Sequence, residues 1–190
     1  LNNNEGEQKY QRWAINAENV AGPSNWVAGT LVVGAPYTLP FHNSFKGGTI
    51  ENQFIGLESS GKNTMWAVTN DVSSDNDNGS IIFRPSETGV STILTGKIAL
   101  QGSMNPKLVF DYRGDGSPKA KVELRFGKKD GSMTEPVWTN TEASTNGKWK
   151  TYRVDIPTEL IGEDYVSLRI IGIADDIADD AVHLDNINIA

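Results

Sequence analysis

The sequence predicts an all-β fold, a two-sheet jelly-roll β-sandwich of the concanavalin-like or galactose-binding-like type. From residue 39 onward, short segments with strand character follow one another at regular intervals, separated by polar turns, and no stretch of ten residues has helical periodicity. Gly, Asn, Ser and Thr are plentiful, which is typical of extracellular β-proteins. With 190 residues, 37% of them hydrophobic, the chain can bury a core of this size.

Two strand patterns precede this region. Residues 10–17 alternate along a strand, residues 26–33 form an apolar run, and a turn-rich stretch with Gly22-Pro23 joins them. The pair resembles the last two strands of a fibronectin type III domain. We therefore expect residues 1–34 to be a polar tail with the end of such a domain, and residues 35–190 to be the jelly roll. The alternative is that both strands belong to the jelly roll's own sheet.

Eleven strands are expected in the jelly roll, at residues 41–45, 54–57, 65–68, 80–83, 93–100, 107–112, 120–126, 137–141, 148–156, 166–173 and 182–189. Asn146-Gly147 predicts a hairpin turn between the strands on either side of it. The four residues that start at Pro157 predict one helical turn with Thr158 as its N-cap. Apolar positions in the strands predict the core, which includes Phe83, Leu108, Phe110, Val122, Leu124, Val154 and Leu168.

The last strand contains a break in its alternation. Val182 and Leu184 share a face with Ile187 only if one extra residue is accommodated at Asp185-Asn186. A slip of one residue that preserves the buried face predicts a β-bulge. The bulge redirects the Asp185 side chain, and a redirected carboxylate can cap a turn or hold a cation.

Composition and motifs exclude several classes of function. The net charge of −7 argues against nucleic acid or an anionic membrane as partner. The chain also contains no run of eighteen apolar residues, which a membrane-spanning helix would require. Without cysteine, and with two histidines that have no metal-ligand spacing, the chain lacks the signatures of a zinc site. Neither the G-x-S-x-G motif of serine hydrolases nor the paired-carboxylate strand motif of jelly-roll hydrolases occurs. We therefore expect that the chain is not an enzyme.

Two acidic segments are candidates for calcium. Residues 71–79 fail as an EF-hand because Pro85 stands where the closing glutamate should be, which leaves an irregular calcium loop or, as we favour, a solvated turn. Asp175-Asp176 and Asp179-Asp180 repel one another unless water or a cation neutralises them. For these carboxylates the alternatives are a calcium site and an exposed loop that keeps the domain soluble.

Five tryptophans offer a further candidate site, because sugar rings stack their apolar faces on exposed indoles. Trp66 and Trp149 occupy positions at which core strands begin, and we expect both to be buried. Trp138 lies close to a predicted loop. It is therefore the tryptophan that we expect to be exposed and able to contact a ligand.

Taken in order, the motifs from residue 39 to 190 resemble the cleaved-adhesin and MAM-like (choice-of-anchor type) jelly-roll modules of Bacteroidetes surface proteins. The residues that carry the resemblance are Leu39-Pro40-Phe41 with Ser44-Phe45, Trp66 with Ile81-Ile82-Phe83, residues 94–100 with 106–112, residues 149–156, and the closing Leu184-Asp185-Asn186-Ile187. The resemblance implies an exported, cell-surface bacterial protein with neighbouring domains in the same polypeptide. It also implies a non-catalytic module that adheres to an extracellular protein or polysaccharide. The alternative is a structural spacer that presents a neighbouring domain.

The same family often carries a structural calcium, which directs attention to Asp185 and to Asn43 of the opening strand. This sequence departs from the family pattern because Lys46 and Asn43 stand at opening-strand positions that are commonly acidic. A lysine beside a divalent site weakens it. We therefore expect Asp185 to lie near Asn43 and to be hydrogen-bonded or paired with lysine, and calcium remains the alternative.

Overall fold

The computed structural model describes residues 6–10, 14–15, 21–22, 29–49, 54–59, 65–114, 120–141, 143–177 and 181–190. The chain divides into two compact units, Leu1–Ala35 and Pro36–Ala190. In the first unit, β1 (Gly6–Tyr10) pairs antiparallel with β4 (Gly29–Val33), and β2 (Ala14–Ile15) pairs antiparallel with β3 (Ala21–Gly22). Its assignment to the end of a fibronectin-like domain stays a prediction.

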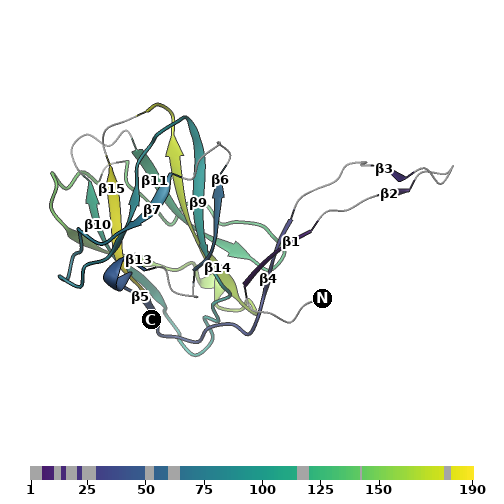
Figure 1. The fold of residues 1–190 in the computed structure, drawn as a ribbon. Helices are drawn as coiled ribbons and strands as arrows, with labels where there is room; N and C mark the ends of the chain where they lie inside the picture. Colours follow the sequence, from purple (N-terminus) through teal and green to yellow (C-terminus); the bar gives the residue numbers. More distant parts are fainter. Residues whose placement is uncertain are drawn as a thin grey trace. The chain divides into compact units, whose positions relative to one another are not determined.

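The second unit is a sandwich of two antiparallel sheets (Figure 1), as the sequence predicts. One sheet has six strands in the order β13-β10-β15-β8-β7, with β5 also paired to β15. In chain order these strands are β5 (Phe41–Asn43), β7 (Trp66–Thr69), β8 (Ser80–Phe83), β10 (Lys107–Gly114), β13 (Lys150–Asp155) and β15 (Val182–Ile189). The opening and closing strands of the unit are therefore neighbours, as we expected.

The other sheet has five strands in the order β12-β11-β14-β9-β6. They are β6 (Phe54–Ser59), β9 (Gly89–Thr95), β11 (Ala120–Lys128), β12 (Trp138–Thr139) and β14 (Val166–Ala174). Two short 3₁₀ turns, η1 (Lys46–Gly48) and η2 (Thr158–Leu160), complete the elements. No helix in the described ranges has the length and apolar character that a membrane span requires.

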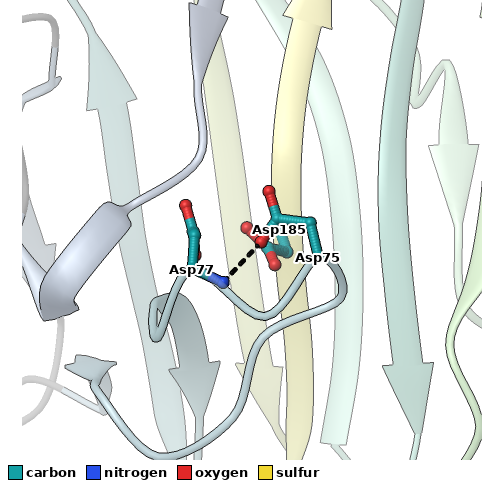
Figure 2. A group of neighbouring side chains, drawn as sticks. All are labelled: Asp75, Asp77 and Asp185. Atoms are coloured by element: carbon teal, nitrogen blue, oxygen red, sulfur yellow. Dashed lines mark hydrogen bonds between the residues drawn. The ribbon is translucent and has the colours of Figure 1, made fainter.

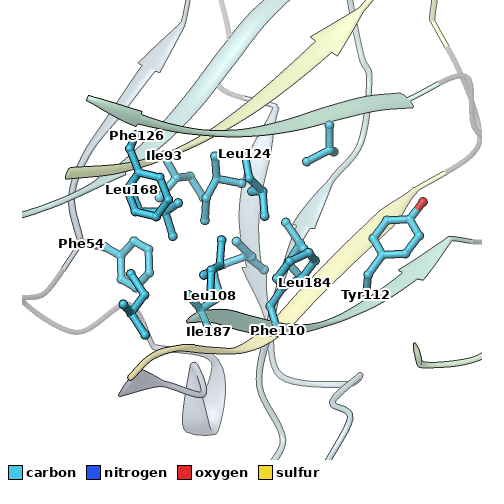
Figure 3. Packing of buried hydrophobic residues seen from close by; sticks show 14 of the residues in the cluster. Phe54, Ile93, Leu108, Phe110, Tyr112, Leu124, Phe126, Leu168, Leu184 and Ile187 are labelled. Carbon is cyan, nitrogen blue, oxygen red and sulfur yellow. The ribbon is translucent and has the colours of Figure 1, made fainter. Parts of the chain in front are cut away.

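The core lies between the two sheets (Figure 3) and follows the period-two pattern of the strands. In β10, for example, Leu108, Phe110 and Tyr112 are fully buried while the residues between them are partly exposed. All of the predicted core residues are buried except Val154, which is partly buried against the same cluster. Inward and outward faces of a strand can therefore be read directly from its alternation.

The predicted bulge in β15 is confirmed. Val109 of β10 is opposite Asn188, and Asp111 is opposite Asp185, so β15 uses one residue more than β10 over the same length. Asn186 supplies the extra residue and adopts a left-handed conformation, with φ of 47°. Leu184 and Ile187 consequently both stay buried, and Asp185 is directed to the outer face of the six-stranded sheet.

Two local predictions were wrong. Asn146-Gly147 forms a turn, with both residues at positive φ, but the turn joins β12 of one sheet to β13 of the other and so makes no hairpin. The local turn signal is correct, but strand pairing is decided by which sheet buries each apolar face. Thr158 lies inside η2, and Pro157 takes the cap position without a side-chain hydrogen bond.

Candidate functional site

Three carboxylates meet at the outer face of the six-stranded sheet. Asp75 and Asp77 come from residues 71–79, the acidic loop that joins β7 to β8, and Asp185 comes from the β15 bulge (Figure 2). One oxygen of each lies within 4.8 Å of the others. Among the described residues this is the group of acidic and histidine side chains that could hold a metal ion.

The pairing of β15 explains why the loop reaches Asp185. On one edge of β15, β8 pairs with the residues up to Leu184 and β5 pairs with the residues from Ile187 onward, so the bulge lies between the two partners. The acidic loop supplies the missing donor there. The Ser74 backbone N–H donates to Asp185 Oδ2 at 2.7 Å, and the Asn186 N–H donates to Oδ1 at 2.7 Å.

Burial gives the Asp185 carboxyl an unusual proton affinity. The side chain is fully buried, which raises its pKa from 3.8 to about 6, although the two backbone N–H groups oppose this rise. The nearby charge of Asp75 raises it further. For the exposed Asp75, slight desolvation raises the pKa, but the hydrogen bonds from Asp77 and Asn186 outweigh it and lower the pKa overall. The carboxylates of Asp75 and Asp77 thus lie beside the buried carboxyl of Asp185, which water solvates poorly.

Asp77 connects the same loop to the opening segment of the domain. The Ser44 hydroxyl donates to Asp77 Oδ2 at 2.6 Å, and the Gly47 backbone N–H donates to the Asp77 carbonyl oxygen at 3.2 Å. The second oxygen, Asp77 Oδ1, is buried and has no hydrogen-bond partner among the described residues. A buried carboxylate oxygen without a donor is costly unless a cation satisfies it.

The backbone packing around the loop is equally tight. A Cβ atom at Gly79 would lie 1.8 Å from the Phe45 carbonyl oxygen, so glycine is required for this close approach. Phe45 is fully buried and adopts a left-handed conformation with φ of 55°. The opening segment and the acidic loop therefore fit together as one structural unit.

The geometry fits a calcium ion. Calcium binds oxygen ligands at about 2.3–2.6 Å, so two of its ligands can be at most about 5 Å apart. The spacing of 4.8 Å between the three carboxylate oxygens meets that limit. Asn43, which we expected near Asp185, is opposite Ile187, and its Oδ1 accepts the Phe45 N–H at 2.8 Å. Lys46 is exposed.

The outcome for Asp185 differs in one respect from our expectation. Its carboxylate is hydrogen-bonded, as we favoured, but the donors are the backbone N–H groups of Ser74 and Asn186 rather than a lysine. The acidic loop is also more than a solvated turn, because Ser74 fixes it to the sheet. Both flanks of the loop are strands, which agrees with the rejection of an EF-hand.

The second acidic segment does not join this group. Asp175 forms an ion pair with Lys121, and Asp176 accepts the N–H of Ile177. Both are exposed, and neither belongs to the carboxylate cluster of the described residues. Residues 179 and 180 lie outside the described ranges. A role of Asp175 and Asp176 in metal binding stays a prediction without support from this geometry.

A polar network extends from the carboxylates across the same face of the sheet. The Ser74 hydroxyl donates to Asp111 Oδ2 at 2.6 Å and accepts the Asn186 side-chain amide at 2.8 Å. On the far side of β10, the Thr151 hydroxyl donates to Asp111 Oδ1. We did not predict that Ser74 and Asp111 would meet, although the outward phase of Asp111 between Phe110 and Tyr112 was a usable signal.

Of the three tryptophans for which we made predictions, Trp66 is buried as expected, whereas Trp138 and Trp149 are placed differently. Trp138 is partly buried, with its ring in edge contact with Phe110, Tyr112 and Tyr152 at 4.9–5.2 Å. Trp149 is also only partly buried, and its ring lies 6.1 Å from that of His183. His183 is on the outer face of β15, so Trp149 covers that face rather than the core.

No family model matches the sequence, and no curated protein sequence matches it. Solved structures do match. The K1 cleaved adhesin domain of Lys-gingipain from Porphyromonas gingivalis W83 is 16% identical with a TM-score of 0.61, and the match covers 80% of this chain and 97% of that domain. This chain therefore shares the β-sandwich fold of that domain. A K3 cleaved adhesin domain of the same protein matches with a TM-score of 0.58 and 14% identity, over 79% of this chain and 96% of that one.

Solved structures of other kinds share the β-sandwich fold as well. A carbohydrate-binding module, TmCBM61, solved in complex with β-1,4-galactotriose, is 14% identical with a TM-score of 0.53, over 77% of this chain and 93% of that one. The glycoside hydrolase domain of Endo-D from Streptococcus pneumoniae R6 is 13% identical with a TM-score of 0.61 over 80% of this chain, and the match covers 28% of that chain. At these identities the likeness establishes the β-sandwich fold and no more.

Proposed function

We propose that residues 36–190 form a non-catalytic binding module that attaches an exported bacterial protein to an extracellular polysaccharide or protein. The observation that carries the proposal is the arrangement of the three clustered carboxylates. Asp77 fixes the acidic loop to the opening segment, and Asp185 fixes it to the sheet and is fully buried beneath it. A buried, loop-fixing carboxylate cannot reach a substrate, whereas general acid–base catalysis requires such contact.

The similar structures support the same function. Cleaved adhesin domains and a module bound to β-1,4-galactotriose share this fold. Because a glycoside hydrolase chain also contains the fold, function has to be argued from the site rather than from the sandwich. The site of this chain favours binding over hydrolysis.

Calcium would occupy the carboxylate cluster in this proposal. Asp75, Asp77 and Asp185 would hold it, and its charge would satisfy the unpartnered Asp77 Oδ1 and neutralise the cluster. The cation supplies a structural charge and no chemistry to a substrate. Its effect is to hold the acidic loop against β15, so that the outer face of the six-stranded sheet keeps one shape.

The first unit, residues 1–35, is proposed to be the end of a fibronectin-like neighbouring domain. This proposal is supported by the division of the chain at Ala35-Pro36. A chain that starts at Pro36 should then unfold at nearly the same temperature as the whole chain. A collapse of its folding would show instead that residues 1–35 complete the jelly roll.

The function is tested by measuring binding of the whole chain, with calcium present, to an array of neutral and acidic glycans and to immobilised fibronectin, fibrinogen and collagen. We expect saturable binding to at least one of these ligands. No binding to any ligand would favour the structural spacer. Release of reducing sugar from a bound glycan would contradict a non-catalytic role.

A further inference from the structure

The two partly buried tryptophans of the domain face different surroundings. Trp138 is paired opposite the buried Leu124, and three aromatic rings surround its indole at the edge of the sandwich. Trp149 directly precedes β13, in phase with Thr151 and out of phase with the inward-pointing Tyr152. The phase therefore directs Trp149 to the outer face of the six-stranded sheet.

Contacts across the sheet confirm the position of this ring. Tyr112 is opposite Lys150, so the next outward residue of β10, Arg113, is adjacent to Trp149. Arg113 is in turn opposite His183, whose ring contacts Trp149 in an edge-to-face arrangement with an interplanar angle of 68°. The Trp149 ring thus lies beside Arg113 of β10 and His183 of β15, and it remains partly exposed to solvent.

The row next to Trp149 carries hydrogen-bonding groups. Thr151 is exposed, and its hydroxyl bonds to the carboxylate of Asp111, which lies one strand further in. Ser74 and Asn186 continue the row up to the acidic loop. The acidic loop also reaches the row of His183, because the Ser80 hydroxyl lies 3.4 Å from His183 Nδ1 and donates to the Val72 carbonyl oxygen.

This combination of groups points to one class of ligand. An indole offers an apolar face to the C–H groups of a pyranose ring, and hydroxyl, carboxylate and amide groups beside it can bond to the sugar hydroxyls. The groups next to Trp149 carry both signs of charge, in Arg113 and Asp111, and the face becomes negative toward the acidic loop. An acidic glycan would place its carboxylates close to Asp111, which disfavours it.

We infer that the outer face of the six-stranded sheet binds a neutral oligosaccharide, with the Trp149 indole against a pyranose ring and with Thr151 and Asp111 beside it. The inference rests on the proposed binding function and deepens it. It also gives the acidic loop a second role. Ser74 bonds both to Asp185 of the carboxylate cluster and to Asp111 of the sugar-binding row, so one residue forms part of each.

The test compares variants of the whole chain on neutral glycans. Xylohexaose, β-1,4-galactotriose and each neutral array glycan retained by the wild type are titrated by calorimetry in calcium. Trp149→Ala should weaken binding at least tenfold, and Thr151→Val should weaken it several-fold. Trp138→Phe, which keeps the aromatic cluster at the sandwich edge, should bind as the wild type does. Thermal unfolding of each variant shows that it is folded.

A second readout avoids dependence on a truncated side chain. In the 15N-labelled protein, the indole N–H signal of Trp149, assigned from its absence in Trp149→Phe, should shift as sugar is added, while that of Trp138 stays in place. A folded Trp149→Ala variant with wild-type affinity, or an unmoved Trp149 signal at saturation, overturns the inference and leaves the binding function intact. Binding to proteins but to no neutral glycan has the same consequence. Binding to no ligand at all overturns both.

Discussion

The two acidic segments of this chain have similar compositions and different structures. Residues 71–79 and residues 175–180 each contain several aspartates before a strand of the six-stranded sheet. The first segment is fixed to β15 through Ser74 and contributes two carboxylates to a cluster with the buried Asp185. In the second, Asp175 and Asp176 are exposed, and their partners are the exposed Lys121 and the backbone N–H of Ile177.

The difference shows that acidity alone does not bring carboxylates together. The first segment differs because it meets a short stretch of β15 whose edge has no strand partner. This stretch is the bulge, which separates the residues paired with β8 from those paired with β5. A loop can enter there and bring its carboxylates against a buried one. In the second segment, Asp175 and Asp176 directly follow the end of β14, which is paired on both edges there, and these two residues meet no such edge.

The largest effect should come from calcium. If the ion binds the first segment, it binds the folded state only, and free calcium at 100 to 1,000 times its dissociation constant should stabilise the domain by about 2.7–4.1 kcal/mol. Thermal unfolding with calcium and then with a chelator measures this. In Asp77→Asn and Asp185→Asn the increase in Tm should be lost.

A large increase in Tm that survives in Asp77→Asn and Asp185→Asn would contradict this assignment, since it would place the ion elsewhere. An unchanged Tm in the wild type would favour the hydrogen-bonded reading of Asp185 without a cation. Magnesium provides a matched control for ionic strength. It requires near-octahedral geometry and gives up its water reluctantly, so its effect should be smaller.

A smaller effect should appear when pH is varied without calcium. The folded-state pKa of Asp185 is about 6 against 3.8 for the free group, so the folded state binds a proton more tightly than the unfolded state does. This contribution to stability is fully present below pH 4 and is lost as the pH rises through 6. It is at most about 3 kcal/mol, because a factor of ten in proton affinity corresponds to about 1.4 kcal/mol.

The pH effect is measured by denaturant unfolding between pH 4 and pH 7.5 in the presence of a chelator. Asp185→Asn should flatten the difference between the two ends of this range, whereas Asp175→Asn should leave it as in the wild type. With calcium bound, the ion replaces the proton on Asp185, so stability should no longer fall over this range. A profile of Asp185→Asn that falls as steeply as that of the wild type would contradict the raised pKa of this carboxyl.

A third effect concerns the fit of the acidic loop against the opening segment. Gly79→Ala places a methyl group where the Phe45 carbonyl oxygen lies, so the backbone of one segment has to move. Overpacking of this kind costs about 1–3 kcal/mol, and the calcium response should weaken with it. Gly162→Ala is the matched control, since its Cβ would meet no atom within 4 Å. Equal stability of the two variants would show that the loop is not closely fitted.

Alternation predicted the strands and the bulge because each depends on which face of a strand is buried. The eleven expected strands overlap those observed, and the slip at Asp185-Asn186 located the residue on which the site is built. The same rule would have separated the tryptophans. Trp149 shares its phase with the exposed Thr151, yet its place at the start of a strand led us to expect it in the core.

What alternation could not supply is the meeting of distant segments. The pairing of Ser74 with Asp185 joins positions 111 residues apart, and Ser44 reaches Asp77 over 33 residues. These contacts follow from the order of strands in the sheet, which local patterns do not encode. For the same reason, the turn at Asn146-Gly147 was predicted and the sheets that it joins were not.

The smallest effect should come from the second acidic segment, and it tests the comparison most directly. The Lys121–Asp175 pair is exposed, with side chains 51% and 63% accessible, and pairs of this kind contribute about 0–1 kcal/mol. Asp175→Ala and Asp176→Ala should therefore change the free energy of unfolding by less than about 1 kcal/mol, with an unchanged response to calcium. Lys121→Ala, which breaks the same pair from the other side, should match Asp175→Ala. If Asp175→Ala instead removes part of the calcium response while Lys121→Ala does not, the second segment also holds a cation, and the contrast between a strand-edge site and a solvated loop no longer stands.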